Sequence, residues 1–311
     1  MTVLLTLDIL VLTSFVITEL YIEGDEAGEL LTDQAQAELA TLERIYNYSI
    51  EESGLISEAT ANNLAIINAA QNYNNQGQIS STLQKQVNQI LLENEGNTES
   101  AKKTFLVSKD LKIIADSDFE RIGQSFESET LINSVLSNPQ QIITNRLISG
   151  QKLQQKFPEL TSLIDTDTVI TQYTFTPVIT SDTRRIEAVL VSVKLLTGKE
   201  SILKQSLVTI GGGYHAVYLQ KQSGEFTLIT SLLDLESHEF GQHHLHDEQY
   251  HLQNFPLPNT LILEAATQVE DEAIIQRMSL KKHQYTVAAK ILTDTLDGAK
   301  VILVREDSPH P

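Results

Sequence analysis

The residues with the richest chemistry lie in one stretch of the second half of the chain. Residues 237–251 hold five of the eight histidines and three carboxylates. Imidazole and carboxylate groups suit Zn²⁺ or Ni²⁺, and His243, His244 and His246 are the candidate ligands. Their spacing matches no closed metal site, so a solvated polar loop is the alternative. If these histidines gain protons near about pH 6, the stretch can also respond to pH.

No constellation of residues predicts catalysis. The chain has no cysteine, which excludes disulfides, cysteine–zinc sites and cysteine nucleophiles. No Gly-x-Ser-x-Gly elbow occurs. The glycine run 211–213 is followed by Tyr214-His215 instead of the Gly-Lys-Ser/Thr of a phosphate-binding loop. Asp165 and Asp167 are loop acids with no second catalytic group nearby. We therefore expect no enzyme activity and no cofactor.

Size and charge narrow the class of protein. A chain of 311 residues suits two domains of ~100–150 residues plus an extension. Its 41% hydrophobic content is enough to build their cores, and its net charge is −19. An acidic surface repels nucleic-acid backbones and anionic lipids, so we expect no nucleic-acid partner.

Short apolar runs predict the elements of a first module. Runs at 104–108 and 111–115 flank the pair Lys109-Asp110, which is typical of a hairpin. A loop over 116–125 follows, and then four apolar residues at helical spacing between 131 and 136.

A long hairpin is expected to close this module, with strands 169–179 and 186–196 around a turn. The same order returns between about 213 and 305, beginning with strands at 214–220 and 225–231.

The residues ahead of the modules are expected to be helical. From Leu30 onward, apolar residues recur at spacings of three and four and predict a long amphipathic helix. The polar run 72–78 predicts a turn, and a second helix is expected at about 80–93.

The first 22 residues are expected to form a membrane-spanning anchor. Residues 3–22 are nearly all apolar, and ~20 residues are enough for ~30 Å of hydrocarbon. Asp8 and Glu19 oppose insertion, each at a cost of a few kcal/mol if it is central. A cleaved signal peptide and a buried soluble helix are the alternatives. The acidic segment 23–29 is more natural on the outer side of a membrane.

The order of these elements resembles the tandem (double) Cache family of extracytoplasmic sensor domains, whose modules are PAS-like. The residues that carry the resemblance are 105–116 (FLVSKDLKIIAD), Ile122-Gly123, Pro177-Val178, 188–193 (AVLVSV), 214–219 (YHAVYL) and 285–292 (YTVAAKIL). It implies an α+β fold in which a long N-terminal helix precedes two modules with antiparallel sheets. The implied domains are the anchor 1–22, a helical spine 23–100, a membrane-distal module 101–198 and a membrane-proximal module 199–311.

The resemblance also implies where a ligand binds. In this family a small molecule lies against the sheet, under the helix and loops of the distal module. The candidate contacts in this chain are Asp116, Arg121, Arg146, Tyr173 and Phe175. A guanidinium such as that of Arg146 can hold a carboxylate through two hydrogen bonds. The amino-acid-binding pattern of the family contains a tryptophan, and this chain has none.

The function implied is that of an extracytoplasmic sensor in the cell (inner) membrane, anchored by its N-terminal helix and dimeric through its long helix. Its small-molecule signal would pass to a histidine kinase, a chemoreceptor rod or a nucleotide cyclase, none of which is in this sequence. The chain is then either a fragment of a larger receptor or a stand-alone binder. Two alternatives are a module that only mediates dimerisation and a periplasmic metal-binding protein that uses the histidine-rich stretch.

Overall fold

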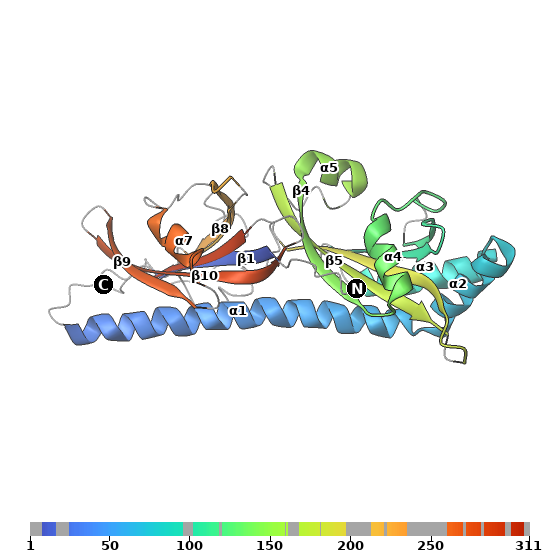
Figure 1. The fold of residues 1–311 in the computed structure, drawn as a ribbon, viewed down its shortest axis with the longest axis horizontal. Helices are drawn as coiled ribbons and strands as arrows, with labels where there is room; N and C mark the ends of the chain where they lie inside the picture. The colour runs from blue at the N-terminus through green and yellow to red at the C-terminus, as the bar shows by residue number, and fades with distance from the viewer. Residues whose placement is uncertain are drawn as a thin grey trace, which may run out of the picture. The chain divides into compact units, whose positions relative to one another are not determined.

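The structure, a computed structural model, divides the chain into two compact units. The residues it describes are 8–16, 25–95, 102–117, 120–158, 160, 168–180, 182–196, 213–220, 223–234, 260–269, 272–280, 283–295 and 300–307. Unit 1 comprises residues 1–47, 165–169 and 197–311, and unit 2 comprises 48–164 and 170–196. Each unit is built on one β-sheet (Figure 1). The α+β fold class and the order of a long helix before two sheet modules are confirmed.

Three helices precede the sheet of unit 2 along the chain. They are α1 (Asp25–Ala61), α2 (Leu64–Gln76) and α3 (Ser81–Glu95). The break between α1 and α2 was not predicted; there Asn63 caps α2 by accepting a hydrogen bond from the amide of Ala65 at 2.9 Å. The turn predicted within 72–78 falls at the end of that run, where Gly77 ends α2 in the left-handed region at φ 71°, and the helix predicted at about 80–93 is α3.

The sheet of unit 2 has the strand order β3-β2-β6-β5-β4. Its strands are β2 (Lys102–Ser108), β3 (Ile113–Asp116), β4 (Ile142–Ser149), β5 (Thr168–Ile179) and β6 (Ile186–Leu195). Both predicted hairpins are confirmed, as is the helix between them, α4 (Glu129–Ser137). Strand β4 and the following helix α5 (Gly150–Lys156) were not predicted from the sequence.

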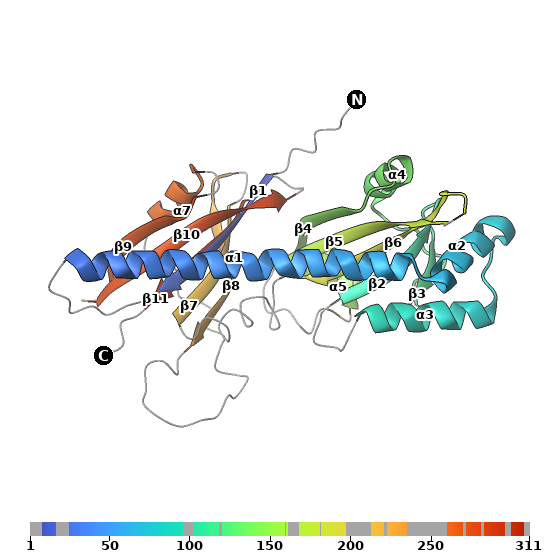
Figure 2. The same cartoon turned by 90° about the horizontal axis from the view of Figure 1, so that it is seen from below.

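Side chains alternate between the two faces of this sheet, as the two-residue period of a strand requires. On one face Leu106, Leu190 and Val178 share a buried core with α2 and α3. The polar residues of that face meet α1: the Ser192 hydroxyl lies 3.2 Å from that of Ser57. The opposite face carries Phe105 and Phe175, and α4 and α5 lie on that side, away from α1 (Figures 1 and 2).

The sheet of unit 1 has the strand order β8-β7-β1-β11-β10-β9. After β1 (Asp8–Val16) come β7 (Gly213–Gln220), β8 (Phe226–Asp234), β9 (Ile274–Leu280), β10 (His283–Thr295) and β11 (Lys300–Asp307). All pairs are antiparallel except β1 with β11. Helix α7 (Leu261–Ala266) packs Ile262 and Leu263 on the core of this sheet.

The expected membrane-spanning helix over residues 1–22 is wrong for the residues that the structure describes there. Asp8–Val16 form strand β1, which pairs with β10, β11 and β7. The run is rich in leucine, valine and isoleucine, and a continuous apolar run fits a strand buried inside a sheet as well as it fits a helix. Among the described residues, no helix is long and apolar enough to cross a membrane.

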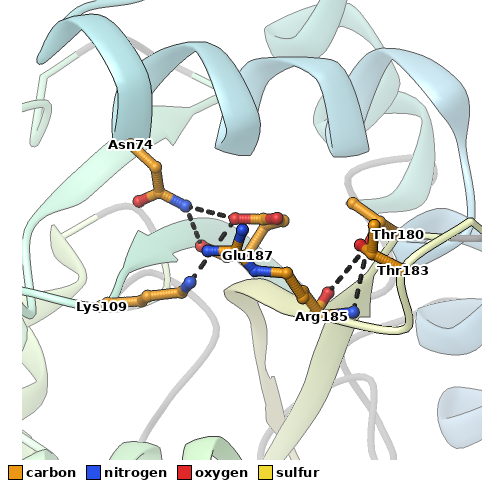
Figure 3. Close-up of polar contacts among 6 residues, drawn as sticks. All are labelled: Asn74, Lys109, Thr180, Thr183, Arg185 and Glu187. Atoms are coloured by element: carbon orange, nitrogen blue, oxygen red, sulfur yellow. Dashed lines mark hydrogen bonds and ion pairs between the residues drawn. The ribbon is translucent and has the colours of Figure 1, made fainter.

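Polar contacts around Glu187 join α2 to the hairpin ends of unit 2 (Figure 3). The buried Glu187 carboxylate accepts a hydrogen bond from Asn74 at 2.8 Å and pairs with Lys109 at 3.5 Å. In the adjoining turn, the Thr180 hydroxyl accepts from the Arg185 amide at 3.1 Å. The hydrogen bonds from Asn74 to Glu187 hold the end of the sheet against α2.

Candidate ligand-binding site

The floor of the candidate site is an aromatic surface on one face of the unit 2 sheet. The strand register places Asp116, Phe105, Val191 and Phe175 directly opposite one another in a row across β3, β2, β6 and β5. Tyr173 lies two residues before Phe175 on β5, and their rings stack with centroids 6.0 Å apart. Alternation along the strands therefore brings residues distant in sequence onto one surface.

Two further rings come from outside the sheet. The Phe126 ring centroid lies 6.2 Å from that of Phe105 and 6.4 Å from that of Phe175. The Phe157 ring, just after α5, lies 6.0 Å from Phe105. All five rings are buried. Aromatic pairs at these distances add stability beyond their buried area.

Arg121 lies over one end of this surface. Its guanidinium carbon is 4.9 Å from the Phe105 ring centroid and 5.4 Å from that of Phe157. The same group donates a hydrogen bond to the carbonyl oxygen of Lys156 at 3.3 Å. The backbone amide of Arg121 donates to the buried carboxylate of Asp116 at 3.2 Å. Asp116 thus holds the loop that presents the guanidinium.

Arg146 lies over the other end. Its guanidinium carbon is 5.5 Å from the Tyr173 ring centroid, and its Nη1 donates to the hydroxyl of Ser128 at 3.2 Å. Burial raises the pKa of the Tyr173 phenol to about 12, although the charge of Arg146 opposes that rise. The phenol is therefore protonated at neutral pH and can donate a hydrogen bond.

An ion pair lies beside these groups. Lys156 of α5 pairs with Glu127, which lies two residues before the start of α4. The hydrogen bond and the charge of Lys156 lower the pKa of Glu127, and Arg121 contributes in the same direction. The pair joins the two segments that supply Phe126 and Phe157.

Cationic groups over aromatic rings define what this site can bind. Within the described part of the chain, neither Arg121 nor Arg146 forms an ion pair with a carboxylate. Each guanidinium has five N–H donors in a planar fork, and only some of them are used by the contacts above. A planar anion such as a carboxylate matches the remaining donors, and an apolar body matches the rings below.

The structure brings all five sequence-predicted site residues to this one face: Asp116, Arg121, Arg146, Tyr173 and Phe175. Sequence reasoning missed Phe105, Phe126, Ser128 and Phe157. Alternation along the predicted strand at 104–108 was a signal for Phe105. The other three lie in loops or at a helix end, where side-chain direction follows no regular repeat and cannot be predicted from the sequence.

The candidate metal ligands His243, His244 and His246 lie outside the described residues. In the part of the chain that the structure covers, no group of three or more His, Cys, Asp or Glu side chains could hold a metal ion. The metal-site hypothesis for the histidine-rich stretch stays a prediction.

Comparisons with known proteins give structural likenesses alone. No protein-family model matches the sequence, and no curated protein matches it. The chain is similar to the sensor domain of the histidine kinase DctB of V. cholerae, at 14% identity with a TM-score of 0.49, covering 89% of this chain and 97% of that one.

Two further solved structures are similar. The periplasmic domain of LuxQ of Vibrio cholerae has 13% identity and a TM-score of 0.46, over 87% of this chain and 97% of that one. The periplasmic domain of RsbU of Chlamydia trachomatis has 12% identity and a TM-score of 0.32, over 88% and 96%. This chain's own elements, a long helix followed by two sheet modules, have the order of a tandem (double) Cache sensor domain.

Proposed function

We propose that this chain is the extracytoplasmic ligand-sensing part of a signalling receptor. The proposed ligand is a small organic anion, bound on the aromatic face of unit 2 by Arg121 and Arg146. The observation that carries the proposal is the pair of guanidinium groups over aromatic rings without a carboxylate partner among the described residues. A binding role fits better than catalysis, since no nucleophile stands beside a general base among these groups.

The roles of the individual residues follow from the geometry. Arg146 supplies a bidentate contact for a carboxylate, and Tyr173 supplies a stacking surface and a hydrogen-bond donor. Arg121 supplies a second positive charge at the other end of the rings. Asp116 positions the Arg121 loop through the backbone amide and need not touch the ligand.

The proposal is tested by a thermal-shift screen of the full chain against mono- and dicarboxylates, amino acids, purines and polyamines. A ligand at 100 times its Kd adds ~2.7 kcal/mol to the free energy of unfolding, which raises the Tm by several degrees. We expect hits among carboxylates and none among polyamines, because the site is cationic.

Substitutions then locate the site. Arg146→Ala removes hydrogen bonds to a charged group worth about 1.5–3 kcal/mol, which weakens binding roughly ten- to hundredfold. The matched control is Arg185→Ala, because the side chain of that exposed arginine lies outside the site. The proposal fails if no organic anion binds, or if Arg146→Ala leaves the affinity for the bound anion unchanged.

We also propose that the chain self-associates through α1, which carries exposed apolar side chains. Tyr48 and Leu55 stand seven residues apart on α1 and expose 62% and 66% of their surface. Residues seven apart lie on the same side of a helix, the spacing of a helix–helix seam. We expect Leu55→Glu to lower the dimer fraction measured by sedimentation, while Glu93→Gln, at an exposed position on α3, leaves it unchanged. A chain that is monomeric before substitution contradicts the proposal.

A further inference from the structure

The opposite face of the same sheet carries a row of polar side chains. Lys102 on β2 lies directly opposite Lys194 on β6, which in turn lies directly opposite Gln172 on β5. Neighbours in such a row have Cβ atoms about 4.5–5.5 Å apart. The Lys194 ammonium donates to the hydroxyl of Ser49 on α1 at 2.8 Å. The row therefore points towards α1, away from the aromatic face.

The two ammonium groups are buried or partly buried, and among the described residues neither has a carboxylate partner of its own. Lys102 is 9% exposed and Lys194 is partly buried. In the described part of the chain, neither forms an ion pair. They donate hydrogen bonds to neutral oxygens, those of Asn94 for Lys102 and that of Ser49 for Lys194. Two carboxylates act on these lysines without pairing with them. Glu95, which pairs with Lys103 at 3.5 Å, acts on Lys102, and the exposed Glu52 of α1 acts on both lysines.

Gln172 is the second, independent observation. Its side chain is 1% exposed, and neither its amide nitrogen nor its amide oxygen has a hydrogen-bond partner. A buried amide without partners costs about 1–3 kcal/mol, so such groups normally have a bound partner. A water molecule could satisfy the amide but would leave the two ammonium groups without an anionic partner of their own.

The electrostatics of the lysines agree with this geometry. Burial lowers the pKa of Lys102 to about 8, and the charge of Lys194 is the next cause. Burial also lowers the pKa of Lys194. An anion beside both ammonium groups would favour the charged form of each.

We infer that Lys102, Lys194 and Gln172 form a binding site for a small inorganic anion of the size of chloride, between α1 and the sheet. Both ammonium groups and the Gln172 NH₂ donate to the ion, and access is from the side of the partly exposed Lys194. The burial of Lys102 and Gln172 excludes larger anions. This site is separate from the proposed ligand site, which lies on the other face of the sheet.

The test replaces sodium gluconate by sodium chloride at constant ionic strength and pH 7, with the full chain and no other ligand. We expect the Tm to rise by a few degrees with increasing chloride and to level off, because a bound ion stabilises the folded state by mass action. Bromide should act like chloride. Chloride NMR line broadening by the protein gives a second, direct readout of binding.

Substitutions locate the ion. Lys194→Met keeps the length of the side chain and Gln172→Leu keeps its approximate size, but each removes a hydrogen-bond donor. In each variant the Tm should therefore no longer rise and level off with chloride, and the chloride line broadening should decrease. The exposed Lys85→Met is the matched control and should keep the full response. Arg146→Ala should keep it too, which separates this site from the ligand site.

Three outcomes overturn the inference. They are a Tm independent of chloride, an effect that rises without levelling and is equal in all variants, and line broadening that survives Lys194→Met. If Lys194→Met does not fold, Gln172→Leu decides, since it removes no charge.

Discussion

Charged side chains on the two faces of the unit 2 sheet have different surroundings. Arg121 and Arg146 rest on aromatic rings, which suits the weakly hydrated and delocalised guanidinium group. Lys102 and Lys194 carry compact ammonium charges, whose burial is more costly and shifts their pKa. Burial therefore favours the loss of a proton from these two lysines.

This difference predicts a dependence of stability on pH. The pKa of Lys102 is about 8 in the folded chain, against 10.5 as the ordinary value. Between these two values the unfolded chain binds more protons, so the free energy of unfolding rises as the pH increases from about 8 to about 10.5. We expect this rise in urea titrations in gluconate buffer and a smaller one in Lys102→Met. An equal rise in both proteins would contradict the assignment.

The helices illustrate what happens at the scale of the element. Helix α1 runs from Asp25 to Ala61 through Gly54, because a single glycine costs a long helix only ~1 kcal/mol. Helix α2 ends at Gly77, whose amide donates to the carbonyl of Tyr73 at 2.7 Å in the left-handed conformation. The presence of a glycine alone therefore does not end a helix, as Gly54 shows. The helix ends where the glycine adopts the left-handed conformation, as Gly77 does.

Gly77→Ala tests this reading. A Cβ at that position would meet no atom within 4 Å, so the cost comes from the backbone alone. We expect a loss of ~1 kcal/mol of stability, because an alanine at positive φ is strained. Gly77→Asn should lose less, since asparagine tolerates this conformation better. Denaturant unfolding measures both, and a neutral Gly77→Ala would contradict the argument.

At the scale of the whole molecule, the two units draw on segments from distant parts of the chain. Strand β1, near the N-terminus, pairs with β10 and β11 near the C-terminus. Helix α1 contributes its first part to unit 1 and its last part to unit 2. The Lys290 ammonium of β10 binds the Glu43 carboxylate of α1 at 2.6 Å within unit 1.

Removal of residues 1–16 should therefore weaken unit 1. Without β1, the neighbouring strands β10, β11 and β7 lose backbone hydrogen bonds and gain exposed edges. Hydrogen exchange should show faster exchange of amides in β10 and β11, while those in β5 and β6 of unit 2 keep their protection. Removal of residues 308–311 is the control. Unchanged exchange in β10 and β11 would show that β1 does not lie in this sheet.

Local patterns in the sequence determined much of unit 2. The apolar runs on either side of short turns, over 104–116 and 169–196, predicted its hairpins, since neighbouring strands joined by short turns pair almost without long-range information. Residues on those strands, such as Tyr173 and Phe175, could therefore be assigned to one face. With the resemblance to double Cache domains, the same patterns led to Asp116, Arg121 and Arg146 as site residues.

Only the tertiary structure decided the rest. By composition, the apolar run at 8–16 fits a membrane helix as well as a strand inside a sheet. In the structure it is a strand, because it pairs with β10 and β11. The positions of Phe126 and Phe157, and the row formed by Lys102, Lys194 and Gln172, likewise depend on which distant segments meet. Such contacts join residues far apart in the chain, and no local period in the sequence encodes them.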